Sequence, residues 1–175
     1  PGVSIVIWTT TPWTLPANVA VAAHPDVDYV TVERDNGGTK EKLILAKNLI
    51  EKVFRGEDVK VVDTFKGKKL KGQKYHPLFT FLPPDKPAHY VVLGEFVTTE
   101  DGTGIVHIAP GCGAEDFQLH KRYDLPVIAL IAAGGNIYYL AKFAGILGLD
   151  VQDIGAQQTG MSVQAFRQKL LDAAK

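Results

Sequence analysis

The sequence predicts an α+β protein that is mainly β, with peripheral α-helices around a β-barrel-like core. Short runs of β-branched and apolar residues recur along the chain. Turn-forming residues such as Gly, Pro, Asn and Asp separate many of these runs. Only a few stretches have helical character, whereas a wound βαβ sheet would need a helix between successive strands. The many short strands therefore favour a barrel-like arrangement over a parallel wound sheet.

The strand predictions follow from β-branched composition and from alternation of apolar and polar residues. The ranges expected to be strands are 3–8, 19–23, 27–33, 42–46, 59–65, 89–93, 104–109 and 126–131. The alternation in 59–65 is typical of a half-buried strand. Asp35, Asn36, Gly37 and Gly38 form a strong turn signal, which predicts a hairpin between the third and fourth of these strands.

Helices are expected at 48–54, at 114–123 and after Ser162, which is a good N-terminal cap. Pro12 and Pro16 should keep the segment after the first strand out of a helix or a central strand. The apolar stretch within 132–161 fits strand and helix equally well, so this range is left unassigned.

Bulk composition is ordinary for a soluble globular protein. The chain has 175 residues, which predicts one domain over 1–175, and 46% of them are hydrophobic. No apolar run approaches the ~20 residues that span a bilayer, so we expect no membrane partner and a cytoplasmic location. The formal net charge is zero, whereas domains that hold long nucleic acids alone are usually basic.

Motifs for common cofactors and metals are missing from the sequence. There is no phosphate-binding GxxxxGK[ST] loop, no GxSxG elbow, no HExxH and no pair of CxxC motifs. We therefore expect no metal and no cofactor. Cys112, the single cysteine, lies between two glycines, and a small residue in a tight turn is favoured over a nucleophile.

Two distant stretches carry the residues with chemical potential. Thr9, Thr10 and Thr11 follow the first predicted strand, where they would present hydroxyls and backbone N–H groups. His107 interrupts an apolar strand, and alternation turns it away from its two neighbours, toward a cleft or solvent. Asp116 falls in the first turn of a predicted helix, where the helix dipole favours a carboxylate. Together they are interpreted as two walls of one small polar pocket.

These motifs resemble the editing domain of isoleucyl-tRNA synthetases. The resemblance rests on WTTTPWTLPAN at 8–18, on the His-Pro pair that follows, on GKKLKGQKYHPLF at 67–79, and on DGTGIVHIAPGCGAED at 101–116. It covers most of residues 5–130, and past that point only fragments match. Cys112 replaces a larger residue, and the acidic-glycine turn usual in the later part is missing.

The resemblance implies a closed β-barrel core and hydrolysis of the ester that links valine to isoleucine tRNA, with valyl-adenylate as a possible second substrate. Water is expected to attack, without metal or covalent intermediate. The residues that match the family's catalytic positions are Thr9, Thr10, Thr11 and Asp116; those that match substrate-binding positions are His107, Asn18, Trp13 and Ala114.

Individual roles also follow from the resemblance. Asp116 is expected to hold the substrate's α-ammonium group, and His107 to wall the side-chain pocket. The three threonines should bind the amino acid and orient the attacking water. The expected partners are the tRNA 3′ end and the remainder of a larger synthetase in cis, with the chain, an excised domain, acting as a monomer.

Alternative functions remain open at this point. One is an editing domain for threonine or another small amino acid, and another is a non-catalytic insertion that binds the tRNA 3′ end. A complete synthetase is disfavoured by length and by the lack of HIGH-like and KMSKS-like motifs. A cluster of lysines is interpreted as a solvated turn in preference to a contact with RNA phosphates. Its members are Lys66, Lys68, Lys69, Lys71 and Lys74.

Overall fold

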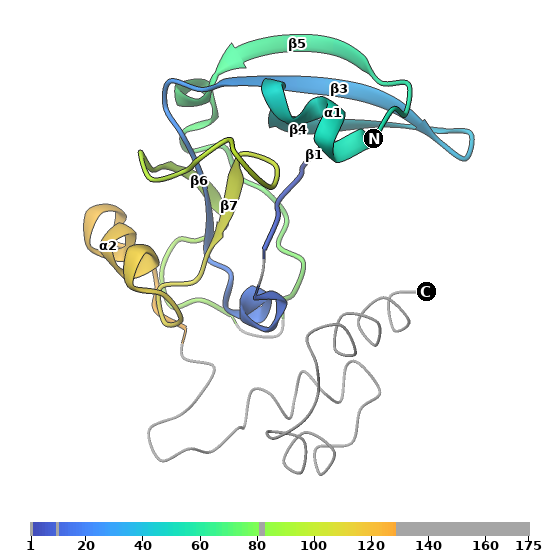
Figure 1. Cartoon of the computed structure of the whole chain (residues 1–175). Helices are drawn as coiled ribbons and strands as arrows, with labels where there is room; N and C mark the ends of the chain where they lie inside the picture. Colours follow the sequence, from blue (N-terminus) through green and yellow to red (C-terminus); the bar gives the residue numbers. More distant parts are fainter. Residues whose placement is uncertain (1, 10, 81–82, 129–175) are drawn as a thin grey trace, which may run out of the picture.

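Two β-sheets form the framework of the computed structural model, which describes residues 2–9, 11–80 and 83–128 (Figure 1). The first sheet has the strand order β1-β4-β3-β5, and the second has the order β6-β2-β7. The strands of the first sheet are β1 (Val3–Ile5), β3 (Asp28–Asn36), β4 (Thr39–Ala46) and β5 (Lys60–Lys66). Those of the second are β2 (Ala20–Ala23), β6 (Tyr90–Leu93) and β7 (Ile105–Ile108).

β3 and β4 form a hairpin at the centre of the first sheet, which confirms the predicted turn. Gly37 and Gly38 both have positive φ, which glycine adopts without steric cost. The side chain of Asp35 accepts a hydrogen bond of 2.6 Å from the Gly38 N–H, which closes the turn. The register then pairs Tyr29 with Ala46 at the far end of the hairpin.

The prediction that 59–65 is a half-buried strand was wrong about burial. Among the described residues, β5 lies at the edge of the sheet and pairs with β3 alone, and most of its side chains are exposed. Val61 and Val62 are 44% and 43% exposed. Alternation in the sequence therefore identified the strand but not its place in the sheet.

β2 lies at the centre of the second sheet, and all four of its residues are buried. It runs parallel to β6 and antiparallel to β7, and this register places Val21 opposite His107. Ile105 and Ile108 of β7 are almost completely buried. The site histidine is therefore held in a strand that pairs with the buried, apolar central strand of this sheet.

Residues near the site connect the two sheets. Trp8 forms an isolated parallel bridge with Val106 of β7, and the Ala46 N–H donates to the Thr103 carbonyl at 2.9 Å. The buried Tyr29 hydroxyl donates to the Gly104 carbonyl at 2.6 Å. Strand pairing among the described residues gives two sheets, and no closed barrel is found there, in contrast to the expectation.

Short helices fill the connections. They are η1 (Pro12–Ala17), η2 (Lys47–Leu49), α1 (Ile50–Phe54), η3 (Gly67–Leu70) and α2 (Ala114–Tyr123). The expectation that the two prolines exclude any helix was wrong, because η1 is a 3₁₀-helix. Its backbone bonds join Thr14 to Thr11 and Asn18 to Leu15, and neither bond needs a proline N–H.

α2 has the bounds that the sequence predicted, and the helix predicted at 48–54 is present as η2 followed by α1. Of the strand predicted at 126–131, residues 126–128 are described and do not form a strand. The unassigned range 132–161 and the helix after Ser162 lie outside the described residues. No helix in the described ranges has the length and apolar character needed to cross a membrane.

Candidate functional site

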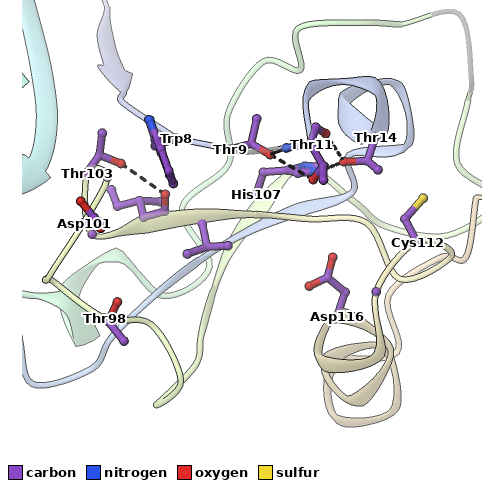
Figure 2. A pocket seen from close by; sticks show the side chains of 15 residues that line it. Trp8, Thr9, Thr11, Thr14, Thr98, Asp101, Thr103, His107, Cys112 and Asp116 are labelled. Atoms are coloured by element: carbon purple, nitrogen blue, oxygen red, sulfur yellow. Dashed lines mark hydrogen bonds between the residues drawn. The ribbon is translucent and has the colours of Figure 1, made fainter. Parts of the chain in front are cut away.

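A cavity of about 360 Å³ lies beside β7, between the threonine segment and the N-terminus of α2. Figure 2 shows Trp8, Thr98 and Asp101 toward one end of it and Cys112 with Asp116 toward the other. The lining residues come from two parts of the chain that are far apart in sequence, 8–14 and 98–116. They are Trp8, Thr9, Thr11, Thr14, Thr98, Asp101, Gly102, Thr103, Gly104, Ile105, Val106, His107, Cys112, Gly113 and Asp116.

The threonine segment is held in place by bonds among its own residues. The Thr9 hydroxyl accepts a hydrogen bond of 3.1 Å from the Thr11 N–H and lies 3.4 Å from the Thr11 hydroxyl. The Thr14 hydroxyl donates to the Thr11 carbonyl at 2.8 Å. Thr11 is exposed and lines the cavity, so its hydroxyl is accessible to a bound molecule. Thr10 lies outside the described residues.

His107 is anchored at both ring nitrogens. Its Nε2 lies 2.9 Å from the Thr14 hydroxyl, and its Nδ1 lies 2.9 Å from Nδ2 of Asn18. The residue is only 6% exposed, and burial lowers the pKa of His107 to about 4. The ring is therefore neutral at pH 7 and forms a fixed part of the cavity wall. Strand alternation predicted the cleft, but not this degree of burial.

Asp116 presents a half-buried carboxylate to the same cavity. Its Oδ2 accepts a hydrogen bond of 2.8 Å from the Ala109 N–H, and its Oδ1 has no hydrogen-bond partner among the described residues. Burial raises the pKa of Asp116, the Ala109 bond opposes that shift, and the Glu115 charge adds to it. An acceptor oxygen in this setting suits a cationic donor such as an ammonium group.

Three predicted residues are placed differently from the rest. Asn18 does not line this cavity; it lies behind His107 and contacts the ring through its side-chain amide. Ala114 is the exposed first residue of α2 and is not among the lining residues. Trp13 lies in η1, next to Thr14. The structure thus brings Thr9, Thr11, His107 and Asp116 together.

Several lining residues were not identified from the sequence as parts of the site. Thr14 and Trp8 belong to the WTTTPWT run that was recognised as a motif, so their neighbourhood was the available signal. Thr98, Asp101 and Thr103 come from the loop before β7. Asp101 and Thr103 belong to the DGTGIVHIAPGCGAED motif, so their neighbourhood was again the available signal, whereas no motif included Thr98.

Cys112 lines the cavity but is poorly suited to nucleophilic attack. Burial and the nearby Asp116 charge raise the pKa of Cys112, which disfavours the reactive thiolate. Its N–H donates to the Ala109 carbonyl at 2.9 Å, as expected for a residue in a tight turn. Within the described residues, no group of three or more His, Cys, Asp or Glu side chains could hold a metal ion.

Sequence comparison finds close relatives among isoleucine–tRNA ligases. The Pyrococcus furiosus enzyme is 49% identical over 152 residues, which cover 81% of this chain and 14% of that protein. The Clostridium novyi enzyme is 56% identical over 132 residues, which cover 75% of this chain and 12% of that protein. The chain therefore spans about one seventh of the length of these relatives.

A family model for the LigA subunit of the aromatic-ring-opening dioxygenase LigAB matches residues 115–171. That range is about one third of the chain and lies mostly outside the described residues. It leaves out the threonine segment and His107. The match therefore does not account for the cavity.

Solved structures with a similar fold are editing domains of leucyl-tRNA synthetases. The crystal structure of GlLeuRS-CP1 has a TM-score of 0.57 at 16% identity and covers 67% of this chain and 43% of that one. The P. knowlesi cytosolic leucyl-tRNA synthetase editing domain has a TM-score of 0.54 at 16% identity and covers 69% and 52%. The chain therefore belongs to the isoleucine–tRNA ligase family, and its fold is similar to that of the CP1 editing domains of class I tRNA synthetases.

Proposed function

We propose that this chain hydrolyses the ester bond between valine and the 3′ end of isoleucine tRNA. The observation that carries the proposal is the convergence of Thr11, His107 and Asp116 on one cavity of about 360 Å³. A wall, a cation acceptor and a set of hydroxyls are the elements that recognition and hydrolysis of a small aminoacyl ester require.

Asp116 is proposed to bind the α-ammonium group of the substrate. Its Oδ1 lacks a hydrogen-bond partner among the described residues, while Oδ2 is fixed by the Ala109 N–H. One oxygen therefore orients the carboxylate and the other accepts the ligand. A charge-assisted hydrogen bond of this kind contributes about 1.5–3 kcal/mol.

His107 is proposed to set the upper size limit of the side-chain pocket. The ring is uncharged and held at both nitrogens, so it cannot swing aside without loss of two hydrogen bonds. A fixed wall of this kind excludes a larger side chain by steric overlap, and cores with this packing adapt poorly to an extra methylene. Valine is proposed to fit and isoleucine to be excluded.

The threonine segment is proposed to position the attacking water. The hydroxyls of Thr9 and Thr11 lie 3.4 Å apart on the cavity wall, where they can act as donors and acceptors to one water molecule. Attack by water on an activated ester needs position and stabilisation of negative charge more than a covalent nucleophile. The terminal hydroxyl of the tRNA itself is proposed to assist.

A separate editing site is needed because the site that attaches the amino acid to tRNA cannot efficiently reject a smaller amino acid. One missing methylene changes binding by only ~1–3 kcal/mol, and isoleucine–tRNA ligases are themselves the measured example of that limit. An editing cavity reverses the test, since the smaller amino acid enters and the larger does not. The valine specificity proposed here uses this size difference.

The two sheets are proposed to act as one barrel around the site. Trp8 bridges the end of the β1 segment to Val106 of β7, and Val91 of β6 donates to the Gln73 carbonyl. These contacts support continuity from one sheet to the other through the site residues. We also propose that the chain works as part of a larger synthetase, that this protein is a monomer, and that it is located in the cytoplasm.

The test is to compare hydrolysis of isoleucine tRNA that carries valine, threonine or isoleucine, with the full-length synthetase that contains this chain. We expect fast loss of the valyl ester and retention of the isoleucyl ester. Faster loss of the threonyl than of the valyl ester would identify a different target. Binding of the tRNA end without any hydrolysis would instead identify a non-catalytic insertion.

A further inference from the structure

The amide of Asn18 has one possible orientation, because its neighbours determine which atom is nitrogen. Nδ2 lies 2.8 Å from the carbonyl oxygen of Ala20, which can only accept a hydrogen bond. The amide oxygen therefore points to the other side, where it accepts a hydrogen bond from the Tyr75 hydroxyl. The second Nδ2 hydrogen is then directed at His107.

This orientation determines the tautomer of His107. Because Asn18 Nδ2 is a donor at 2.9 Å, His107 Nδ1 must be the acceptor, and the ring proton must be on Nε2. The Nε2 proton is then donated to the Thr14 hydroxyl at 2.9 Å. Thr14 in turn passes its own hydrogen to the Thr11 carbonyl at 2.8 Å. Every hydrogen along this path therefore has one acceptor, and Figure 2 shows Thr11, Thr14 and His107 side by side at the cavity.

Tyr75 holds this path from outside the cavity that His107 lines. It lies, with Asn18, on a second cavity of about 570 Å³ and does not line the first. Burial raises the pKa of Tyr75, so the phenol keeps its proton and remains a donor to Asn18. Tyr75 therefore cannot touch a substrate in the first cavity, and any effect it has on that site passes through Asn18.

His89 fixes the backbone of Asn18 in the same way. Its Nε2 donates to the Asn18 carbonyl oxygen at 3.1 Å, and its ring packs edge-on against Tyr75 with centroids 5.9 Å apart. Asn18 is thus held at its main chain and at both ends of its amide. A side chain held this firmly can impose an orientation on its neighbour.

Other ionisable groups around His107 do not counteract this arrangement. Asp101, Cys112 and Asp116 line the cavity on the open side of the ring, and Tyr75 and His89 contact Asn18 behind it. Burial is the cause of the lowered pKa of His107, with no charged neighbour acting on it. The ring is thus neutral because of its surroundings, and Asn18 decides which nitrogen keeps the proton.

We propose that Asn18 and Tyr75 are positioning residues that hold His107 as a neutral imidazole with its proton on Nε2, so that the cavity wall stays uncharged and fixed. This inference rests on the proposed editing function for its purpose, but its structural part does not. Asn18 then acts on the substrate only through His107, which differs from the substrate-binding role that the resemblance implies for it.

The experiment follows the imidazole nitrogens of His107 by ¹⁵N NMR in the full chain, as pH is varied. The wild-type protein should show a protonated Nε2 and an unprotonated Nδ1 down to about pH 5, where an ordinary histidine would already be charged. Asn18→Asp keeps the shape and places a carboxylate against Nδ1. This variant should raise the His107 pKa by roughly 1–3 pH units and protonate both nitrogens at mildly acidic pH.

Tyr75→Phe removes the hydroxyl that holds the Asn18 amide oxygen, while the Ala20 carbonyl still accepts from Nδ2. Because the amide is then held at one end only, we expect a minor fraction of the other His107 tautomer to appear in this variant. Tyr90→Phe is the matched control, because the Tyr90 hydroxyl donates to the Tyr123 carbonyl and not to Asn18. The control should leave the nitrogen spectrum of His107 unchanged.

Hydrolysis gives a second readout with the full-length synthetase. In Asn18→Asp, the rate for valyl-tRNA relative to wild type should rise by up to roughly tenfold between about pH 6 and about pH 9, as the charged His107 loses its proton. A structural defect would lower the ratio equally at every pH. If hydrolysis is absent in all proteins but the spectra behave as described, the proposed function fails and the positioning role stands.

Two results would overturn the inference. One is a wild-type His107 that carries its proton on Nδ1, or that titrates near its ordinary pKa. The other is a Tyr75→Phe protein whose His107 spectrum equals that of the wild type, which would remove Tyr75 from the path.

Discussion

The Thr14 hydroxyl lies 2.9 Å from Nε2 of His107, although 93 positions separate the two residues in the sequence. This contact joins the threonine segment to β7 and thereby defines one wall of the cavity. Its partner bond, from the same hydroxyl to the Thr11 carbonyl, extends the connection to the residue that is proposed to orient water. The wall and the hydrolytic segment are thus parts of one hydrogen-bonded unit.

Thr14→Val should break this unit without a change of shape. The variant leaves the buried Nε2–H of His107 without an acceptor, which costs about 1–3 kcal/mol. Chemical denaturation measures this loss in the free energy of unfolding. Thr14→Ser keeps the hydroxyl and should restore most of the stability, and equal losses in both variants would contradict the role given to the hydroxyl.

His107→Ala should enlarge the cavity and admit isoleucine. We expect hydrolysis of isoleucyl-tRNA to rise at least ~tenfold, since the wall that excludes one additional methylene is gone. Deacylation of purified isoleucyl- and valyl-tRNA by the full-length enzyme measures the change. His107→Gln, which keeps more of the volume, is the control and should admit isoleucine less. A His107→Ala enzyme that cleaves valyl-tRNA and still spares isoleucyl-tRNA would show that His107 is not the wall.

Asp116→Asn should abolish ammonium binding but leave the fold intact. The amide oxygen can still accept the Ala109 hydrogen bond, while the charge that attracts an ammonium group is lost. A loss of about 1.5–3 kcal/mol corresponds to a decrease in kcat/KM of roughly 10- to 200-fold.

Glu115→Gln is the matched control for this variant. It neutralises the adjacent, exposed carboxylate, which does not line the cavity. A similar decrease in both variants would point to general electrostatics instead of a specific contact. Burial raises the pKa of Asp116. As the pH is lowered, wild-type activity should therefore be lost at a higher pH than it would be with an ordinary aspartate.

The neutral His107 makes stability depend on pH in a defined window. Its pKa is about 4 in the folded protein, against 6.5 ordinarily, so between these values only the unfolded chain binds the proton. The contribution of His107 to the free energy of unfolding should therefore increase as the pH rises from about 4 to 6.5 and stay constant above 6.5. As the pH falls from 6.5 to 4, the loss should be about 3 kcal/mol at most.

The measurement for this window is the difference in unfolding free energy between wild type and His107→Gln at several pH values. The variant has no ionisable group at this position, and contributions such as that of Asp116, which have the opposite sign, cancel in the difference. A difference that does not change with pH would show that folding does not lower the pKa of His107.

Gly104→Ala should destabilise the junction between the two sheets. Gly104 has a φ of +72°, and an added Cβ would lie 2.4 Å from the Cβ of Ala46. Overpacking of this kind costs about 1–3 kcal/mol in addition to the backbone strain. Gly37→Ala is the control, because it has a similar φ of +62° with nothing within 4 Å. Thermal unfolding should show a clearly larger loss at Gly104 than at Gly37.

Local signals predicted much of the fold. The Asp35–Gly38 turn, the strands that flank it and the bounds of α2 follow from short-range hydrogen bonds and from helix-terminus chemistry, which neighbouring residues determine. The exposure of β5 did not follow, because a strand's place at an edge depends on which other strands pair with it. The 3₁₀-helix after Thr11 was missed, since its bonds avoid both prolines.

The sequence by itself determined the types of side chain available for the chemistry: hydroxyls after the first strand, a histidine within an apolar strand and a carboxylate at a helix start. Their motifs also identified the family. Only the tertiary structure decided that these groups share a cavity, that Asn18 lies behind His107, and that His107 is neutral. The reason is physical: burial and the direction of a hydrogen bond depend on contacts between residues about 90 positions apart, and no local pattern specifies them.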